Sequence, residues 1–240
     1  MGLSERFYFP IAPCFMKTHI PNFITCLNLF SGCVGVTFAF VGQLDVAAYC
    51  VLASGIFDFF DGLAARALHV KSSIGKQLDS LADVVSFGFL PGVVLYCMLQ
   101  IAWPGNNYMP YFGFLVTIFS ALRLAKFNID ERQSTDFLGL NTPMNAFYVV
   151  SLPFIAGTYG SIVYHPAFLV CSIVVTSLLL VSNIRLFSMK LHSLSWRENG
   201  WKFAFLLVSA VLVVLLRFAA TPLVLALYFL FSYMHFRQIR

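Results

Sequence analysis

The sequence predicts an all-α integral membrane protein, a polytopic helical bundle with about eight transmembrane helices. Its 240 residues are 60% hydrophobic and only 10% charged, and the mean hydropathy is +0.84. Ordinary soluble domains carry about 25% charged residues, so the composition excludes that class. The apolar residues also form successive stretches of about 20, the helix length that crosses the ~30 Å hydrocarbon core of a bilayer.

Eight apolar segments follow one another, separated by short polar or proline-containing links. The predicted helices cover residues 22–42, 45–69, 73–101, 110–128, 143–164, 166–184, 201–217 and 221–236. Glu5 and nearby prolines are atypical of a signal peptide, so the first residues are interpreted as an interfacial arm. We expect residues 1–184 to form this arm and a six-helix core. Residues 185–240 are expected to add a link and a two-helix extension for packing or dimerisation.

The basic residues predict the orientation of the helices. They gather at the two termini and in alternate links, so fourteen of the fifteen Lys and Arg fall on one side and only Arg217 falls opposite. The positive-inside rule assigns the basic side, with both termini, to the cytosol. The net charge of +5 indicates contact with anionic membrane lipids, and no basic stripe with interleaved aromatic residues suggests a nucleic-acid partner.

Four aspartates stand out in this nearly uncharged chain. Residues 58–83 read DFFDGLAARALHVKSSIGKQLDSLAD, with the spacing D-x2-D-G-x2-A-R-x8-G-x3-D-x3-D. A turn of 100° per residue places Asp58 and Asp61 on one face of a helix. Asp79 and Asp83 share a face of the next helix, beyond a break near residues 69–72. Glycines and alanines between the carboxylates leave space, so we expect a groove between the two helices, open to the cytosolic side.

Four carboxylates near a bilayer require compensating positive charge. Arg66 alone cannot balance them, whereas two divalent cations would. Ligands made only of oxygen select hard ions, so Mg²⁺ or Mn²⁺ is expected and Ca²⁺ also fits. Two such ions polarise a phosphoryl group, which predicts a pyrophosphate ligand. The alternative function is a cation or proton transporter, although transporters more often show internal repeats and interrupted helices.

The aspartate spacing resembles the signature of the CDP-alcohol phosphotransferase family, with all its specified positions filled. The resemblance implies a membrane enzyme, commonly a homodimer, whose six-helix core transfers a phosphoalcohol group from a CDP-linked donor to a hydroxyl and releases CMP. It implies that Asp58, Asp61, Asp79 and Asp83 bind two metal ions, and that Asp83 also accepts the proton of the acceptor. It implies further that CDP-diacylglycerol is bound by Asn22, Thr25, Gly62, Arg66, Ser72 and Gly75.

Three other stretches resemble the serine-using branch of this family in bacteria and archaea. They are IPNFITCLNLFSG at 20–32, LRLAKFN at 122–128 and GLNTPMNA at 139–146. This resemblance implies L-serine as the acceptor of the phosphatidyl group and a prokaryotic inner membrane as the location.

The charge of serine also points to residues 122–128. Arg123 and Lys126 are spaced to bind a carboxylate together, but they would equally bind glycerol 3-phosphate or inositol phosphate, or anchor a helix end at the interface. Asn128, Thr142 and Asn145 are further candidates for the acceptor, although each is as well explained as a helix cap or backbone partner.

Overall fold

The computed structural model describes residues 12–70, 72–129, 137–187 and 196–239, and almost all of them are helical. Two elements are short 3₁₀-helices, η2 and η4, and one, η1, is a π-helix. In chain order the elements are α1 (Ala12–Phe40), α2 (Leu44–Ala67), α3 (Ser73–Asp83), η1 (Val84–Phe89), α4 (Leu90–Ala102), η2 (Met109–Gly113), α5 (Phe114–Ile129), β1 (Phe137–Leu138), α6 (Thr142–Val163), α7 (Pro166–Val181), β2 (Arg185–Leu186), α8 (Trp196–Leu216), η4 (Arg217–Ala220) and α9 (Thr221–Ile239).

These elements confirm the all-α polytopic class, and each of the eight predicted segments is helical. Six stretches among the described residues are long and apolar enough to cross a membrane. The helix α7 is shorter, at 16 residues, and α8 with α9 counts as one apolar stretch, 200–237. The strands β1 and β2 were not predicted, because two-residue strands leave no periodic pattern.

The start of the first helix was predicted wrongly. Proline usually marks a helix beginning, which suggested residue 22, but α1 begins at Ala12 and continues through Pro21. Helices that cross membranes tolerate an internal proline when neighbouring groups satisfy the freed backbone. The predicted interfacial arm falls largely on residues 1–11, outside the described residues.

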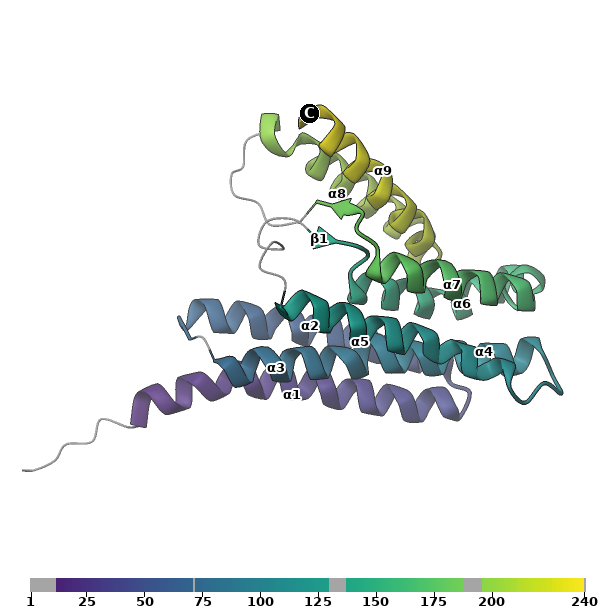
Figure 1. Cartoon of the computed structure of the whole chain (residues 1–240), viewed down its shortest axis with the longest axis horizontal. Coiled ribbons are helices and arrows are strands. Elements are labelled where there is room, and N and C mark those ends of the chain that lie inside the picture. Colours follow the sequence, from purple (N-terminus) through teal and green to yellow (C-terminus); the bar gives the residue numbers. More distant parts are fainter. Residues whose placement is uncertain (1–11, 71, 130–136, 188–195, 240) are drawn as a thin grey trace, which may run out of the picture.

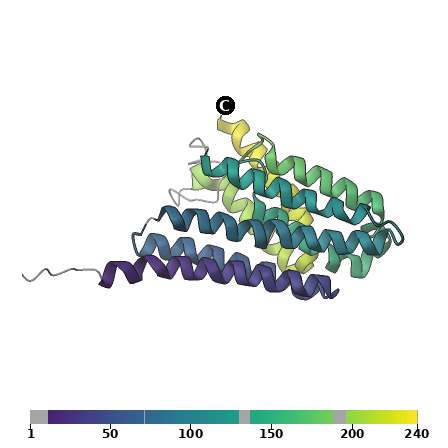
Figure 2. The ribbon, with the colours of Figure 1, turned by 60° about the horizontal axis from the view of Figure 1, so that its bottom comes forward.

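The helices α1 to α7 run along the longest axis of the molecule, while α8 and α9 form a hairpin set obliquely against them (Figure 1). The turned view shows α1 to α5 side by side (Figure 2). The run from α3 through α4 is the most buried of the candidate spans. Its residues Phe87, Leu90, Val94 and Met98 are fully enclosed in the apolar core. The core therefore surrounds the helix that follows the acidic stretch and holds it in place.

A small latch joins the α8–α9 hairpin to the rest of the bundle. β1 pairs with β2 in antiparallel register, with Phe137 opposite Leu186. The next residue, Phe187, is held by α9 on both sides: its N–H donates to Ser232 Oγ at 3.4 Å, and its carbonyl oxygen accepts from the Tyr228 hydroxyl at 2.8 Å. These contacts connect α9 to β2 and, through β1, to the core; the role of residues 185–240 in packing or dimerisation stays a prediction.

Candidate active site

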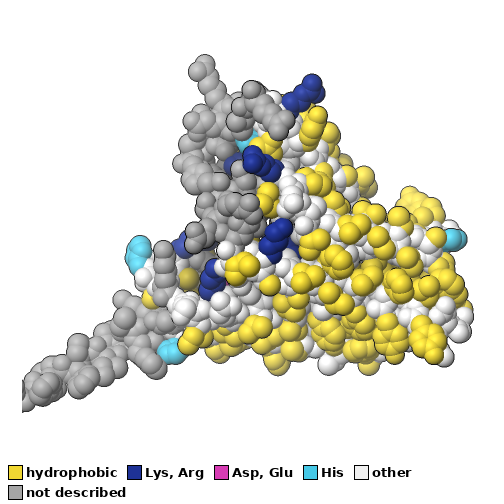
Figure 3. Space-filling view, in the orientation of Figure 1, with side chains coloured by type: hydrophobic (Ala, Val, Ile, Leu, Met, Phe, Trp, Pro, Cys, Tyr) yellow, Lys and Arg dark blue, Asp and Glu magenta, His cyan; other side chains and the backbone are white. Residues whose placement is uncertain are grey.

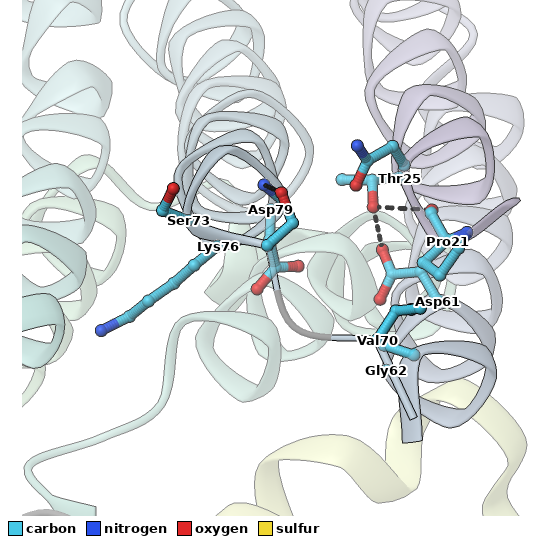
Figure 4. Close-up of a pocket in the computed structure, with 12 residues that line it drawn as sticks. Pro21, Thr25, Asp61, Gly62, Val70, Ser73, Lys76 and Asp79 are labelled. Atoms are coloured by element: carbon cyan, nitrogen blue, oxygen red, sulfur yellow. Dashed lines mark hydrogen bonds between the residues drawn. The ribbon is translucent and has the colours of Figure 1, made fainter. Parts of the chain in front are cut away.

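The predicted groove between α2 and α3 is present, and α1 forms its third wall (Figure 4). Its volume is about 460 Å³, within the ~300–1,000 Å³ range of ligand sites. It opens at the end of the bundle where α2 ends and α3 begins. The lining residues are Pro21, Asn22, Thr25, Asp61, Gly62, Ala65, Val70, Ser72, Ser73, Gly75, Lys76 and Asp79.

Three of the four predicted metal ligands cluster between α2 and α3, and two of them, Asp61 and Asp79, line the groove. Asp58 and Asp61 lie one turn apart on α2, and Asp79 on α3 faces them. Each of the three offers one carboxylate oxygen, and these oxygens all lie within 4.8 Å of one another. Figure 4 shows Asp61 and Asp79 pointing toward each other from opposite walls. The helical spacing of the sequence therefore brings the carboxylates together as predicted.

Asp83 occupies a different position. It is the last residue of α3, one turn beyond Asp79, and it is buried with only 8% of its surface exposed. It belongs neither to the group of three carboxylates nor to the lining of the groove. The π-helix η1 begins at the next residue, and such π segments frequently occur at functional sites. The charge of Asp83 nevertheless interacts with those of Asp58, Asp79 and Asp61, so Asp83 lies beside the cluster, and its role as a fourth metal ligand stays a prediction.

Asn28 on α1 is a central residue of the site that the sequence analysis did not single out. Its Nδ2 donates to Asp83 Oδ1 at 3.3 Å, and its carbonyl oxygen accepts from the hydroxyls of Ser54 and Ser86 at 3.1 and 3.0 Å. It therefore ties α1 to α2 and η1. The available signal was its position three residues after Thr25, on the same face of an otherwise apolar helix.

The clustered aspartates fit a hard divalent cation. All donors are carboxylate oxygens, the ligand type that Mg²⁺, Mn²⁺ and Ca²⁺ prefer. Asp79 Oδ1 is buried and has no hydrogen-bond partner in the described part of the chain. Nearby basic side chains do not compensate: Lys76 points away from the groove and donates to the carbonyl oxygen of Asn128 (Figure 4). Arg66 is exposed on the last turn of α2. The donor set therefore calls for a cation.

Thr25 orients one of these carboxylates. Its hydroxyl donates to Asp61 Oδ2 at 2.6 Å and also lies 3.1 Å from the carbonyl oxygen of Pro21. Groups that hold a metal ligand in this way usually contribute 10- to 100-fold to metal affinity.

Thr25→Val keeps the shape of the side chain and removes this hydrogen bond. We expect it to weaken Mn²⁺ binding by about 10- to 100-fold, measured by paramagnetic resonance titration. Thr37→Val is the matched control, because Thr37 is exposed on the same helix and bonds only to the backbone of its own turn. Equal affinities for the two variants would contradict the orienting role.

Five of the six residues predicted to bind CDP-diacylglycerol line the groove. Ser72 caps α3 by accepting from Gly75 N at 3.2 Å. A Cβ at position 75 would lie 2.9 Å from Asn22 Oδ1, so a larger residue there would displace the Asn22 side chain. The free amides of a helix start bind anions well. Arg66 is the exception, because it does not line the groove.

The predicted acceptor residues fall into two groups. Arg123 is buried, with 7% of its surface exposed, and donates to Thr142 Oγ1 at 3.1 Å, while its Nε has no partner among the described residues. A residue that only anchored a helix end at the membrane interface would be exposed, so the burial of Arg123 disfavours that alternative. Lys126 and Asn128 lie nearer the surface, where they bond to the side chains of Asn183 and Ser80. The structure thus joins Arg123 with Thr142 but pairs the other two candidates elsewhere.

Asn145 lies one turn after Thr142 on the same face of α6. It is fully buried, and neither polar atom of its side chain has a partner within the described ranges. Unsatisfied buried amides are costly, so Asn145 and the Nε of Arg123 mark places where a polar ligand would be stabilised.

Comparisons with known proteins give one consistent family. Residues 18–178 match the model of the CDP-alcohol phosphatidyltransferase family, a range that contains every candidate site residue. CDP-diacylglycerol–serine O-phosphatidyltransferase of Bacillus subtilis is 31% identical over 186 residues, 76% of this chain and 97% of that protein. The enzyme with the same name from Helicobacter pylori is 34% identical over 73% of each chain. Archaetidylserine synthase of Methanothermobacter thermautotrophicus is 30% identical, covering 69% of this chain and 68% of its own.

Proposed function

Since the chain belongs to the CDP-alcohol phosphatidyltransferase family, we propose that it transfers the phosphatidyl group of CDP-diacylglycerol to the hydroxyl of L-serine and releases CMP. It is a multi-pass membrane enzyme of phospholipid synthesis. The single observation that carries the proposed chemistry is the cluster of three carboxylates, two on α2 and one on α3, at the wall of the groove.

Serine is the best supported acceptor. The names of the bacterial relatives imply a phosphatidyl group and that of the archaeal relative an archaetidyl group. All of these names give serine as the acceptor. Glycerol 3-phosphate and inositol phosphate appear in none of these names. The similarity of the bacterial enzymes supports CDP-diacylglycerol as the donor.

The groove is suited to the diphosphate of the donor. Asp58, Asp61 and Asp79 would hold Mg²⁺ or Mn²⁺, and Ca²⁺ has the same ligand preference. Such ions supply charge stabilisation for a phosphoryl group and its leaving oxygen. Asn22 and the capped start of α3 line the same space and would bind the nucleotide side of the donor. Asp83 borders this group and interacts with the charges of Asp58 and Asp79; we assign it primarily to proton transfer and retain it as a further metal ligand.

The proposed reaction is a single displacement at phosphorus. Asp83 accepts the proton of the serine hydroxyl, whose oxygen forms a bond to the phosphorus that carries diacylglycerol. The bond between this phosphorus and the oxygen of CMP breaks, and CMP leaves with the electron pair. The guanidinium of Arg123 interacts electrostatically with Asp83. One serine would thus place its carboxylate on Arg123 and Thr142 and its hydroxyl toward Asp83, with Lys126 and Asn128 as outer residues.

The space beside Gly62 gives a specific test of donor binding. A Cβ at position 62 would meet nothing within 4 Å, so a larger side chain would fill the groove without disturbing the packing. We expect Gly62→Leu to raise the KM for CDP-diacylglycerol by about tenfold or more, which corresponds to about 1.4 kcal/mol of lost binding. The thermal unfolding midpoint should stay close to that of the unsubstituted chain.

Gly157→Leu is the matched control for this variant. Gly157 also lies within a helix, α6, with open space beside its Cα, but it is remote from the groove. An unchanged KM in Gly62→Leu, or the same increase in Gly157→Leu, would contradict donor binding at this wall.

The acceptor assay tests the whole proposal. The purified chain is given CDP-diacylglycerol with serine, glycerol 3-phosphate or inositol phosphate, and CMP release and the lipid product are measured. Of the three acceptors, only serine is expected to cause release of CMP. A chelator should stop this release, and added Mg²⁺ or Mn²⁺ should restore it. Release that is independent of serine would overturn the acceptor assignment, and ion flux into liposomes without any nucleotide would favour a transporter.

We also propose that the active site and both termini face the cytosol in a prokaryotic inner membrane, and that the chain is a homodimer. Lys and Arg on the visible face gather toward the end of the bundle that contains the groove (Figure 3), which supports this orientation by the positive-inside rule. Labelling of single cysteines from either side of the membrane tests the orientation. Mass measurement in detergent tests the dimer.

A further inference from the structure

A second cavity lies away from the aspartates, between the α8–α9 hairpin and the helices α2 and α6. Its volume is about 470 Å³, again in the ~300–1,000 Å³ range of ligand sites. Its lining is apolar except for one hydroxyl and one guanidinium, and consists of Leu52, Phe147, Val150, Val213, Arg217, Phe218, Thr221 and Val224. We call it the hairpin groove, and it shares no lining residue with the aspartate groove.

The tip of the hairpin lies beside interior turns of the bundle. Leu52 comes eight residues after the start of α2, and Val150 eight residues after the start of α6. Each is therefore roughly 12 Å from the nearer end of its helix. Phe218, at the tip, stacks on Phe154 in the middle of α6, with ring centroids 4.0 Å apart. The hairpin groove thus lies within the depth of the ~30 Å hydrocarbon layer.

Arg217 is an exposed cation in these surroundings. The pattern of basic residues predicts only that it lies on the side opposite the other Lys and Arg, whereas its neighbours in the structure are apolar interior turns. Among the described residues it has no hydrogen-bond or ion-pair partner. Its φ of 51° lies in the left-handed region, which non-glycine residues seldom adopt and which directs attention to a functional role.

A positive charge at this depth is costly unless an anion accompanies it. A soluble anion would satisfy the guanidinium but leave the aliphatic walls of the groove uncovered. An anionic lipid satisfies both parts, because a guanidinium binds phosphate through paired hydrogen bonds and the walls bury an acyl chain. The lining therefore has the chemistry of a whole phospholipid molecule, with one charged end and one apolar body.

We propose that the hairpin groove binds one anionic phospholipid of the surrounding membrane, with its phosphate on Arg217 and an acyl chain along Leu52, Val150 and Val213. This lipid is separate from the substrate, and it fills the space between the hairpin and the core. It thereby completes the contact of α8 and α9 with α2 and α6.

The test uses the full chain in nanodiscs of phosphatidylcholine that contain a trace of photoactivatable lipid with a diazirine on its acyl chain. The probe is either phosphatidylglycerol or phosphatidylcholine with the same chains. After illumination, crosslinked peptides are mapped by mass spectrometry. We expect crosslinks on α6 and α8 peptides that line the hairpin groove, with phosphatidylglycerol about tenfold above phosphatidylcholine.

Three variants locate the site. Arg217→Gln should lower the phosphatidylglycerol yield at these peptides by about tenfold, and Val213→Trp, which fills the cavity, should lower the yield of both lipids. Arg237→Gln removes an exposed cation from the other end of the same hairpin and should change nothing. Equal yields of the two lipids, an undiminished yield in Arg217→Gln, or an equal loss in Arg237→Gln would overturn the proposal. Circular dichroism melting confirms that each variant is folded, and no readout depends on transferase activity.

Discussion

Asp79→Asn is expected to reduce CMP release from CDP-diacylglycerol by about 10³-fold or more, because it removes the only carboxylate that α3 contributes to the described cluster of three. Charge stabilisation by a bound cation contributes several kcal/mol to phosphoryl transfer, and each 1.36 kcal/mol is about tenfold in rate. Mn²⁺ binding, followed by paramagnetic resonance, should be lost in parallel.

The same substitution should not weaken the fold. Asparagine has the shape of aspartate, and without metal the change removes repulsion between like charges that face each other. We therefore expect the metal-free variant to unfold at a temperature no lower than the unsubstituted chain. Asp45→Asn is the matched control, because Asp45 is an exposed residue of the first turn of α2, far along the helix from the cluster. Activity above a tenth of normal in Asp79→Asn would contradict the proposed cation site.

Asp83→Asn should lower kcat by about 10²- to 10⁴-fold, the usual contribution of a general base. Because Asp83 lies outside the group of three carboxylates, Mn²⁺ binding and the KM for CDP-diacylglycerol should change little. This combination separates a proton acceptor from a metal ligand. Loss of Mn²⁺ binding equal to that of Asp79→Asn would show instead that Asp83 is primarily a ligand, as its place in the sequence signature also allows.

A large share of the fold could be predicted from the sequence, because membrane spans depend on length and hydropathy alone. The eight helical segments follow from this. The meeting of Asp58, Asp61 and Asp79 could also be predicted, since a rigid helix fixes which residues share a face and the break at residues 68–72 forces the two helices together.

Features that depend on contacts between distant segments could not be predicted in the same way. The role of Asn28 depends on α1 passing close to both α2 and η1, where a Cβ on Gly32 would overlap Ser86. The burial of Arg123 depends on α5 packing beside α7 and η1. The depth of Arg217 in the membrane depends on the oblique angle between the α8–α9 hairpin and the other helices (Figure 1). Counting basic residues on each side gives no information on that angle.

The latch at β1 and β2 has a mechanical consequence. Phe187, the residue after β2, is hydrogen-bonded to Tyr228 and Ser232 of α9. β2 itself pairs with β1, which ends four residues before Thr142. If bilayer thickness or lateral pressure displaced α9 sideways, the paired strands would transmit that displacement to Thr142, the residue that accepts a hydrogen bond from Arg123. The KM for serine is thus expected to depend on the thickness of the host membrane through β1, β2 and Phe187.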